Sequence, residues 1–255
     1  NRIMISRLCD LHFVPTARAR ENLMAEGIAA ADIVLTGNTV VDALRLEGGR
    51  SRPFRDLALR RAFAGLRERD KAVVVTTHRR ENLGGPLESL CEAFRILVER
   101  HPHLHLFYPV HMNPLVSGIV RRRLRHARAH LLPALDYFDL TRLLRESFFV
   151  LTDSGGLQEE APSLGKPVIV LRKVTERPEA VSAGAAVLAG TNTRAVVRLA
   201  SRLMRDETFY DSMTHGTGIY GDGRASARII QSLRHYFGLS RRRSADFRSV
   251  TREIK

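Results

Sequence analysis

The stretch that decides the fold is FFVLTDSGGLQEEAP, residues 148–162. Its first four residues are continuously apolar, which is typical of a strand buried on both faces in a parallel sheet that helices cover. The strand leads through Asp153, Ser154, Gly155 and Gly156 directly into a helical pattern. A buried strand, a glycine turn and a helix form the repeating unit of a doubly wound α/β sheet. Ligands of such sheets bind at the carboxyl ends of the strands.

The same order of elements continues on both sides of this stretch. Short runs rich in β-branched or aromatic residues predict strands at 12–15, 33–35, 72–76, 104–110, 130–132, 148–152, 167–171 and 186–188. Amphipathic stretches predict helices at 17–26, 57–66, 87–100, 115–126, 138–146, 157–164, 193–204 and 225–237. From about Lys71 to Gly190 strands and helices alternate without a break, which predicts a Rossmann-like domain.

Four segments are expected along the chain. Residues 46–70 read as a linker followed by a helix, because Gly48, Gly49 and Pro53 lie among charged residues there. Residues 1–45 hold only about two strands and a helix, and the chain opens with Asn, so we expect the C-terminal end of a truncated Rossmann-like domain. Residues 71–238 are expected to form one complete Rossmann-like domain with C-terminal helices, and 239–255 a basic, disordered tail.

Composition excludes several classes of protein. With 44% hydrophobic and 27% charged residues among 255, the chain can bury a core and is not globally disordered. No run reaches the roughly 18 apolar residues of a membrane helix, and no leader opens the chain, so we expect no membrane span and a cytoplasmic location. Cys9 and Cys91 lack the spacing of a disulfide framework or a zinc site.

The net charge of +14 comes from 41 basic residues, of which 37 are Arg. They cluster at 121–128 and 241–255, and such clusters can follow a nucleic-acid backbone or an acidic membrane surface. The alternative explanation is a solvated helix face and a charged tail. The chain has no Trp, no interleaved aromatic residues and no nucleic-acid-binding motif, so the sequence favours the second explanation and nucleic acid is not an expected partner.

Polar motifs follow the predicted strands. His78, Arg79 and Arg80 come after the strand 72–76 and suit phosphate binding and proton transfer, although a lone His is more often structural. After the strand 148–152, the hydroxyl of Ser154 and the free amides of a helix start can hold a diphosphate. The alternative is a turn capped by Asp153 or Ser154. No Gly-Lys-Ser/Thr follows, so this is not a Walker loop.

Two further loops belong to the same sheet edge. The charged loop 172–179 follows the strand 167–171, and PVHMNP at 109–114 sets His111 at another strand end. Glu160, one turn into its helix, can accept hydrogen bonds from a ribose diol or can merely offset the helix dipole. Together these loops predict a nucleoside diphosphate site.

The motifs together resemble the non-hydrolysing UDP-N-acetylglucosamine 2-epimerases. The resemblance is carried by HRREN (78–82), PVHMNP (109–114), DSGGLQEEAPSLGKPV (153–168) and TERPE (175–179), with TGNTVVD (36–42) and YGDG (220–223) in addition. It runs from Asn1 to about Phe237. It implies an α/β fold of the glycosyltransferase-B kind, of which this chain is the C-terminal portion, and a homodimer at full length.

The resemblance also implies an isomerase. Members of this family interconvert UDP-N-acetylglucosamine and UDP-N-acetylmannosamine by eliminating UDP across C1 and C2 and adding it back, with no nicotinamide cofactor and no metal. By similarity His78 is the catalytic histidine, and Arg79 and His111 contact an allosteric UDP-N-acetylglucosamine. The positions that match substrate contacts are Leu135, Leu140, Ser154, Gly155, Gly156, Glu160 and Arg177.

Two features depart from the family pattern. Leu140 stands where many relatives place Phe beside the uracil. The family's acidic catalytic residues are expected upstream of Asn1, so the fragment alone is expected to be inactive. Two alternatives stay open at this point: a UDP-sugar glycosyltransferase of the same fold, and a binding-only or nonfunctional remnant.

Overall fold

The computed structural model describes residues 1–48 and 52–249 and divides into two compact units. Within the described residues, 52–217 form the larger unit and 1–48 together with 218–249 form the smaller one. The larger unit contains the strand-end motifs at 78–82, 109–114, 153–168 and 175–179. It is therefore the unit in which the site is sought.

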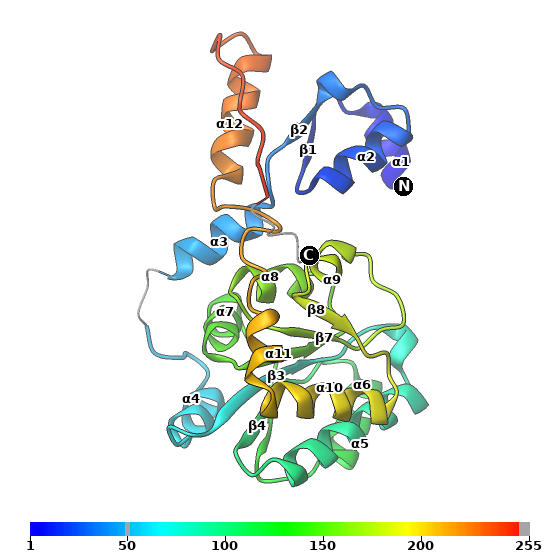
Figure 1. Ribbon diagram of the computed structural model, residues 1–255, viewed down its shortest axis with the longest axis vertical. Helices are drawn as coiled ribbons and strands as arrows, with labels where there is room; N and C mark the ends of the chain where they lie inside the picture. Colours follow the sequence, from blue (N-terminus) through cyan, green and yellow to red (C-terminus); the bar gives the residue numbers. More distant parts are fainter. Residues whose placement is uncertain (49–51, 250–255) are drawn as a thin grey trace. The chain divides into compact units, whose positions relative to one another are not determined.

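A six-stranded parallel sheet forms the centre of the larger unit (Figure 1). Its strands are β3 (Lys71–Thr76), β4 (Leu104–Pro109), β5 (Ala129–Leu132), β6 (Phe149–Thr152), β7 (Val168–Val170) and β8 (Ala186–Leu188). They lie side by side in the order β5-β4-β3-β6-β7-β8. The chain moves outward from β3 to β5 and then returns to lay β6 on the other side of β3. The direction of winding thus reverses between β3 and β6, which is the topological switch point of a Rossmann fold.

Helices cover both faces of this sheet (Figure 1). They are α4 (Leu57–Ala64), α5 (Gly85–Arg100), α6 (Pro114–Arg123), α7 (Tyr137–Glu146), α8 (Leu157–Ser163), α9 (Pro178–Ser182), α10 (Thr193–Arg205) and α11 (Glu207–Ser212), with a 3-10 turn η2 (Arg80–Asn82) after β3. Val73 and Val75 of β3 pack in one cluster with α5, α6 and α10. Neighbouring strand residues face opposite sides, so the fully buried Val74 faces the layer of α4 and α7.

The smaller unit is built around two parallel strands, β1 (His12–Val14) and β2 (Ile33–Leu35). Its helices are α1 (Arg2–Leu8), α2 (Ala17–Ala25), α3 (Thr39–Gly48) and α12 (Ala225–Tyr236), with the 3-10 turn η1 (Ala30–Asp32). The motifs at 36–42 and 220–223 meet here. Gly37 has a φ of +80°, and a Cβ on it would lie 3.1 Å from the Cα of Gly221, so this position needs glycine. A Cβ on Gly221 would lie 3.2 Å from Cγ2 of Val41, which is a tight contact.

The structure confirms each of the eight expected strands and eight expected helices, within a few residues at their ends. Four short helices were not expected: α1, α3, α9 and α11. In α3 the Asn38 side chain accepts a hydrogen bond from the N–H of Val40 at 3.0 Å, and Val41 and Leu44 are buried. The helix continues to Gly48, so its last three residues lie in the segment expected to be linker.

The described boundaries also differ from the expected ones near the C-terminus. Helix α12 belongs to the smaller unit, whereas we expected it with residues 71–238. The Asp42 carboxylate of α3 accepts hydrogen bonds from the N–H groups of Ala225 and Ser226 at 3.0 and 2.8 Å and so caps α12. A long-range cap of this kind leaves no local sequence signal.

The expected disordered tail is ordered in part. Phe247 is buried with Val14, Leu23 and Ile33 in the core of the smaller unit, and its N–H donates to the carbonyl of Leu35 at 2.7 Å. A single aromatic residue among arginines thus anchors this part of the tail. Residues 250–255 of the expected tail lie outside the described residues.

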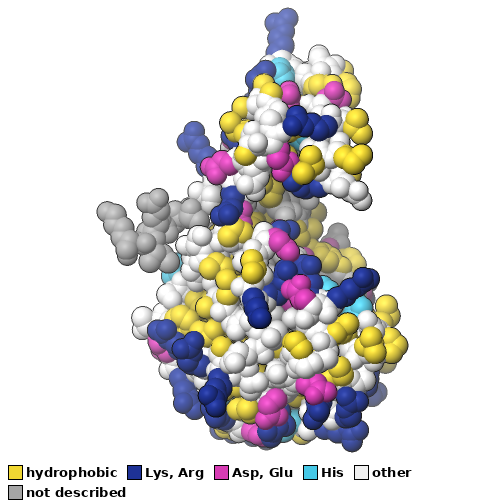
Figure 2. All heavy atoms as spheres, turned by 90° about the vertical axis from the view of Figure 1, so that its right-hand side faces the viewer, with side chains coloured by type: hydrophobic (Ala, Val, Ile, Leu, Met, Phe, Trp, Pro, Cys, Tyr) yellow, Lys and Arg dark blue, Asp and Glu magenta, His cyan; other side chains and the backbone are white. Residues whose placement is uncertain are grey.

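The basic charge is dispersed on the face shown in Figure 2, where lysine and arginine side chains lie at separate places with acidic side chains among them. Among the described residues, no helix has the length and apolar character needed to cross a membrane.

Candidate functional site

Strands β3 and β6 bring two motifs together at the switch point. Thr76 and Thr152 are paired in register at the ends of these strands, and their hydroxyl groups lie 2.6 Å apart. The chain continues from Thr76 into His78 and from Thr152 into Asp153 and the glycine turn. Parallel pairing therefore brings together residues that are 75 positions apart in the sequence, such as His78 and Asp153.

A cavity of about 300 Å³ opens at this edge of the sheet. Seven of the ten residues expected in the site line it: His78, His111, Leu135, Leu140, Ser154, Gly156 and Glu160. They come from the ends of β3, β4, β5 and β6 and from helices α7 and α8. The rings of His78 and His111 lie nearly parallel, with their centroids 6.1 Å apart.

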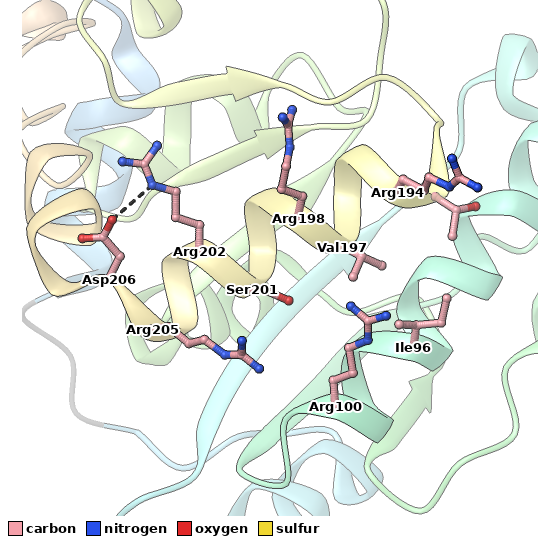
Figure 3. Close-up of a pocket in the computed structure, with 10 residues that line it drawn as sticks. Ile96, Arg100, Arg194, Val197, Arg198, Ser201, Arg202, Arg205 and Asp206 are labelled. Carbon is pink, nitrogen blue, oxygen red and sulfur yellow. Dashed lines mark hydrogen bonds and ion pairs between the residues drawn. The ribbon is translucent and has the colours of Figure 1, made fainter.

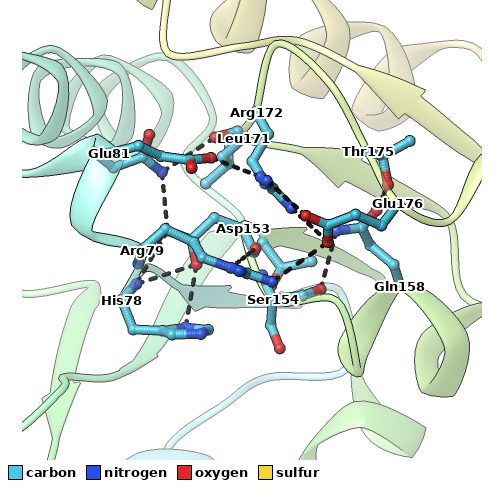
Figure 4. A network of polar contacts seen from close by, with 12 residues as sticks. His78, Arg79, Glu81, Asp153, Ser154, Gln158, Leu171, Arg172, Thr175 and Glu176 are labelled. Atoms are coloured by element: carbon cyan, nitrogen blue, oxygen red, sulfur yellow. Dashed lines mark hydrogen bonds and ion pairs between the residues drawn. The ribbon is translucent and has the colours of Figure 1, made fainter. Parts of the chain in front are cut away.

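Asp153 is fully buried behind the cavity and collects hydrogen bonds from the loop after β3 (Figure 4). Its carboxylate accepts from the N–H groups of His78 and Arg79 at 3.0 Å and from the side-chain amide of Asn82 at 2.9 Å, and it lies 3.2 Å from Nδ1 of His78. Burial by itself raises the pKa of Asp153, but these hydrogen bonds outweigh it and leave the pKa lowered. The carboxylate is therefore ionised and spans the switch point.

The turn at Ser154, Gly155 and Gly156 does not have the side-chain cap by Asp153 or Ser154 that the sequence left open as an alternative. Helix α8 has Gly156 at its N-cap and no side-chain cap, because the Asp153 carboxylate points to the loop after β3 instead. Among the described residues, the backbone N–H groups of Gly155 and Gly156 have no acceptor. Two donors thus remain available beside the cavity.

Three expected site residues do not line the cavity: Arg79, Gly155 and Arg177. The Arg79 guanidinium lies 3.6 Å from the carboxylate of Glu176. The same guanidinium would lie 3.5 Å from a Cβ on Gly155. The Nε of Arg177 donates to the carboxylate of Glu159. In this structure both arginines are paired with carboxylates of the protein.

Two neighbouring carboxylates of α8 have raised pKa values. Burial raises the pKa of Glu160, and the charge of Glu159 raises it further. Burial also raises the pKa of Glu159, and the guanidinium of Arg177 offsets this only in part. Glu160 thus faces the cavity at a cost to stability, which is common for functional groups.

The expected uracil position forms an apolar wall of the cavity. Leu135 and Leu140 both line the cavity. Tyr137 of α7, which lies between them in the sequence, lines it as well. Sequence reasoning missed Tyr137, although an aromatic residue three positions from Leu140 on a helix shares its face. The local sequence predicts only a capping role for Asp153, because its partners in the loop after β3 lie more than 70 positions away.

A second groove, of about 490 Å³, lies between α5 and α10, away from the switch point (Figure 3). Its lining includes five arginines, Arg100, Arg194, Arg198, Arg202 and Arg205. Arg202 is paired with Asp206 at 3.1 Å. The charges of Arg205 and Arg100 add to burial in lowering the pKa of the adjacent His101.

The family described as UDP-N-acetylglucosamine 2-epimerase matches residues 1–234. This match covers more than nine tenths of the chain, including the switch-point cavity. The chain belongs to the UDP-N-acetylglucosamine 2-epimerase family. The UDP-N-acetylglucosamine 2-epimerase of Bacillus subtilis is 42% identical over 250 residues, which is 97% of the chain and 63% of that relative. The chain thus spans slightly less than two thirds of the length of its curated relatives.

Solved structures of the epimerase family have the same fold. A Staphylococcus aureus structure described as an MnaA-UDP co-structure is 39% identical, with a TM-score of 0.89 over 97% of this chain and 66% of that one. A Neisseria meningitidis UDP-GlcNAc 2-epimerase, described as bound to UDP-GlcNAc, is 35% identical, with a TM-score of 0.84 over 91% of this chain and 63% of that one. These similarities confirm the expected α/β fold of the glycosyltransferase-B kind.

Proposed function

We propose that the switch-point cavity binds UDP, and that the whole protein interconverts UDP-N-acetylglucosamine and UDP-N-acetylmannosamine. The observation that carries the proposal is that His78, Ser154, Gly156 and Glu160 line one cavity at the topological switch point. The structures of relatives described as bound to UDP or UDP-GlcNAc support it.

Each part of the nucleotide is assigned to one wall of the cavity. The diphosphate lies at Ser154 and at the amides of Gly155 and Gly156, which supply donors without a side chain in the way. Glu160 accepts from the ribose hydroxyls. The uracil lies along Leu135 and Leu140.

His78 then lies beside the diphosphate. When the C1–O bond breaks, its electron pair passes to a diphosphate oxygen, and loss of the C2 proton supplies the electrons of the C1=C2 double bond. A proton or a hydrogen bond from His78 stabilises the departing oxygen. Re-addition of UDP reverses these steps and places a proton on the opposite face of C2.

The C2 proton needs a base other than the nucleotide-binding groups. In the described part of the chain, Glu160 is the one carboxylate that lines the cavity, and the proposal assigns it to the ribose. We therefore assign the cavity to nucleotide binding and to the departure of the diphosphate. The expected effector contacts of Arg79 and His111 remain predictions.

Binding is tested by calorimetry of UDP with the 255-residue chain and two glycine variants. Gly156→Ala places a methyl group in the cavity wall, where its nearest neighbours lie at 3.7 Å or more, so the fold tolerates it. Gly118→Ala on α6 has open space around it and serves as the matched control. We expect UDP to bind the parent chain and Gly118→Ala equally, and Gly156→Ala at least about tenfold more weakly. Equal binding by all three would place the nucleotide elsewhere.

The reaction is tested in the whole protein with UDP-N-acetylglucosamine in deuterium oxide and no acceptor. We expect deuterium at C2 of both epimers and loss of the exchange in His78→Asn. Transfer of the sugar only when an acceptor is added would identify a glycosyltransferase instead.

A further inference from the structure

One buried group of the switch point has no part in the binding proposal. Asp153 is fully buried and is not among the residues that line the cavity, yet it contacts the one histidine assigned to the reaction. A buried carboxylate costs free energy unless its oxygens are paired. Its position therefore needs a reason.

Part of the reason is structural. The N–H groups of His78 and Arg79 and the side-chain amide of Asn82 donate to Asp153, and Asn82 donates also to the carbonyl of Leu171 at 3.2 Å. These bonds join the loop after β3 to the ends of β6 and β7. They do not involve the imidazole ring of His78.

The contact with the ring is separate. Nδ1 of His78 lies 3.2 Å from Oδ1 of Asp153. Figure 4 marks this contact with a dashed line. An ionised carboxylate can only accept, so Nδ1 must carry a proton. In the neutral ring Nε2 then holds the lone pair, and in the protonated ring Nε2 is the second donor.

We propose that Asp153 is a positioning residue for His78: it fixes the tautomer and the ring orientation so that Nε2, and not Nδ1, faces the bound diphosphate. This inference rests on the proposed function for the identity of the ligand, but the tautomer itself does not. The charged and titratable groups near the ring are Asp153, which contacts Nδ1, Arg79, which donates to the carbonyl of Asp153, His111, whose ring stacks on that of His78, and Glu160, which lines the same cavity.

The direct test is nitrogen NMR of 15N-histidine-labelled chain without ligand. We expect the neutral His78 ring to carry its proton on Nδ1. A neutral ring protonated on Nε2 in the parent chain would overturn the proposal, and this measurement needs no variant.

Two variants separate positioning from loop support. Asp153→Asn keeps the shape but supplies an amide donor, so we expect the Nδ1-protonated form to lose its dominance. Asn82→Ser removes one hydrogen bond to the same carboxylate without touching the ring, and the tautomer should stay. An unchanged tautomer in folded Asp153→Asn, or an equal change in Asn82→Ser, would leave Asp153 with a structural role only.

In the whole protein, Asp153→Asn should slow deuterium exchange at C2 by about 100-fold, the scale of a general acid, while UDP affinity changes by less than about threefold. Absence of UDP binding in the parent chain would defeat the proposed function, and the NMR result would still decide the role of Asp153.

Discussion

The guanidinium of Arg177 is paired with the carboxylate of Glu159, in the first turn of the helix that follows the glycine turn. Glu159 is largely buried, whereas Arg177 is more exposed. Removing the arginine alone should therefore leave a buried carboxylate without its cation. We expect Arg177→Ala to lower the free energy of unfolding by about 1–3 kcal/mol in denaturant titrations.

The double variant Arg177→Ala with Glu159→Gln separates stability from binding. It should recover much of the lost stability, since a neutral amide costs less to bury, but it should still bind the UDP-sugar more weakly than the parent chain. Full recovery of binding by the double variant would mean that Arg177 acts only on Glu159.

Glu160 should lower the stability of the folded protein while it contributes to UDP binding. Its pKa is raised in the folded protein, so at neutral pH the folded state carries a carboxylate charge that the unfolded chain holds more easily. Glu160→Gln should therefore raise the melting temperature at pH 7, and this gain should shrink as the pH falls and Glu160 takes up a proton. The same variant should weaken UDP binding in calorimetry. A lower melting temperature together with unchanged UDP affinity would contradict both assignments.

Leu140 lines the cavity at the proposed uracil position, where relatives are expected to have Phe. Leu140→Phe should tighten UDP and UMP binding by about fivefold, since base stacking on an aromatic ring is worth roughly 1–3 kcal/mol. Leu140→Met changes the side chain without adding a ring and should leave the affinity nearly the same. Inorganic pyrophosphate should bind all three forms alike. Equal gains with Met and Phe would point to packing and not to stacking.

A histidine pair at the other end of the sheet should make the larger unit acid-sensitive. Nδ1 of His105 lies 3.1 Å from Nε2 of His130, and burial together with the neighbouring ring lowers the pKa of His130 to about 4. Burial also lowers the pKa of His105.

Below about pH 6.5 these two histidines therefore bind protons in the unfolded chain but not in the folded chain, so the free energy of unfolding falls as the pH drops toward 4. His130→Phe removes one of these groups and should flatten the fall in melting temperature over this range. Parallel melting curves for parent and variant would exclude His130 as a cause.

The arginines along α10 should repel one another. Arg194, Arg198 and Arg202 are spaced four residues apart on one helix, and like charges at this spacing cost a few tenths of a kcal/mol per pair. Arg198→Glu should therefore raise stability by about 0.5–1 kcal/mol at low salt, and Arg198→Gln by about half as much. The gain should vanish in 1 M salt, because exposed charges are then screened. A gain that survives high salt would have another origin.

Local sequence patterns were sufficient for most of the elements. The run from Phe148 to Gly156 predicted a buried strand and a glycine turn, and both are present, because hydrophobic period and turn residues act over a few positions. Helix α3 was not among the predicted helices, although Val41 and Leu44 form its buried face. The burial of Phe247 could not be predicted from the local sequence, because its partners Val14 and Ile33 are more than 200 positions away.

The residue types of the site were determined by the sequence alone: His78, Ser154, Gly156 and Glu160 follow or lie near strand ends, where a parallel sheet gathers its ligands. Only the tertiary structure decided their partners. Pairing of β6 with β3 put Asp153 behind His78, and pairing of β7 with β6 accompanies the contact of Arg177 with Glu159. Tyr137 lines the cavity together with Leu135 and Leu140. The reason is physical: periodicity and turn propensity are local to the chain, whereas hydrogen bonds and ion pairs depend on which strands become neighbours.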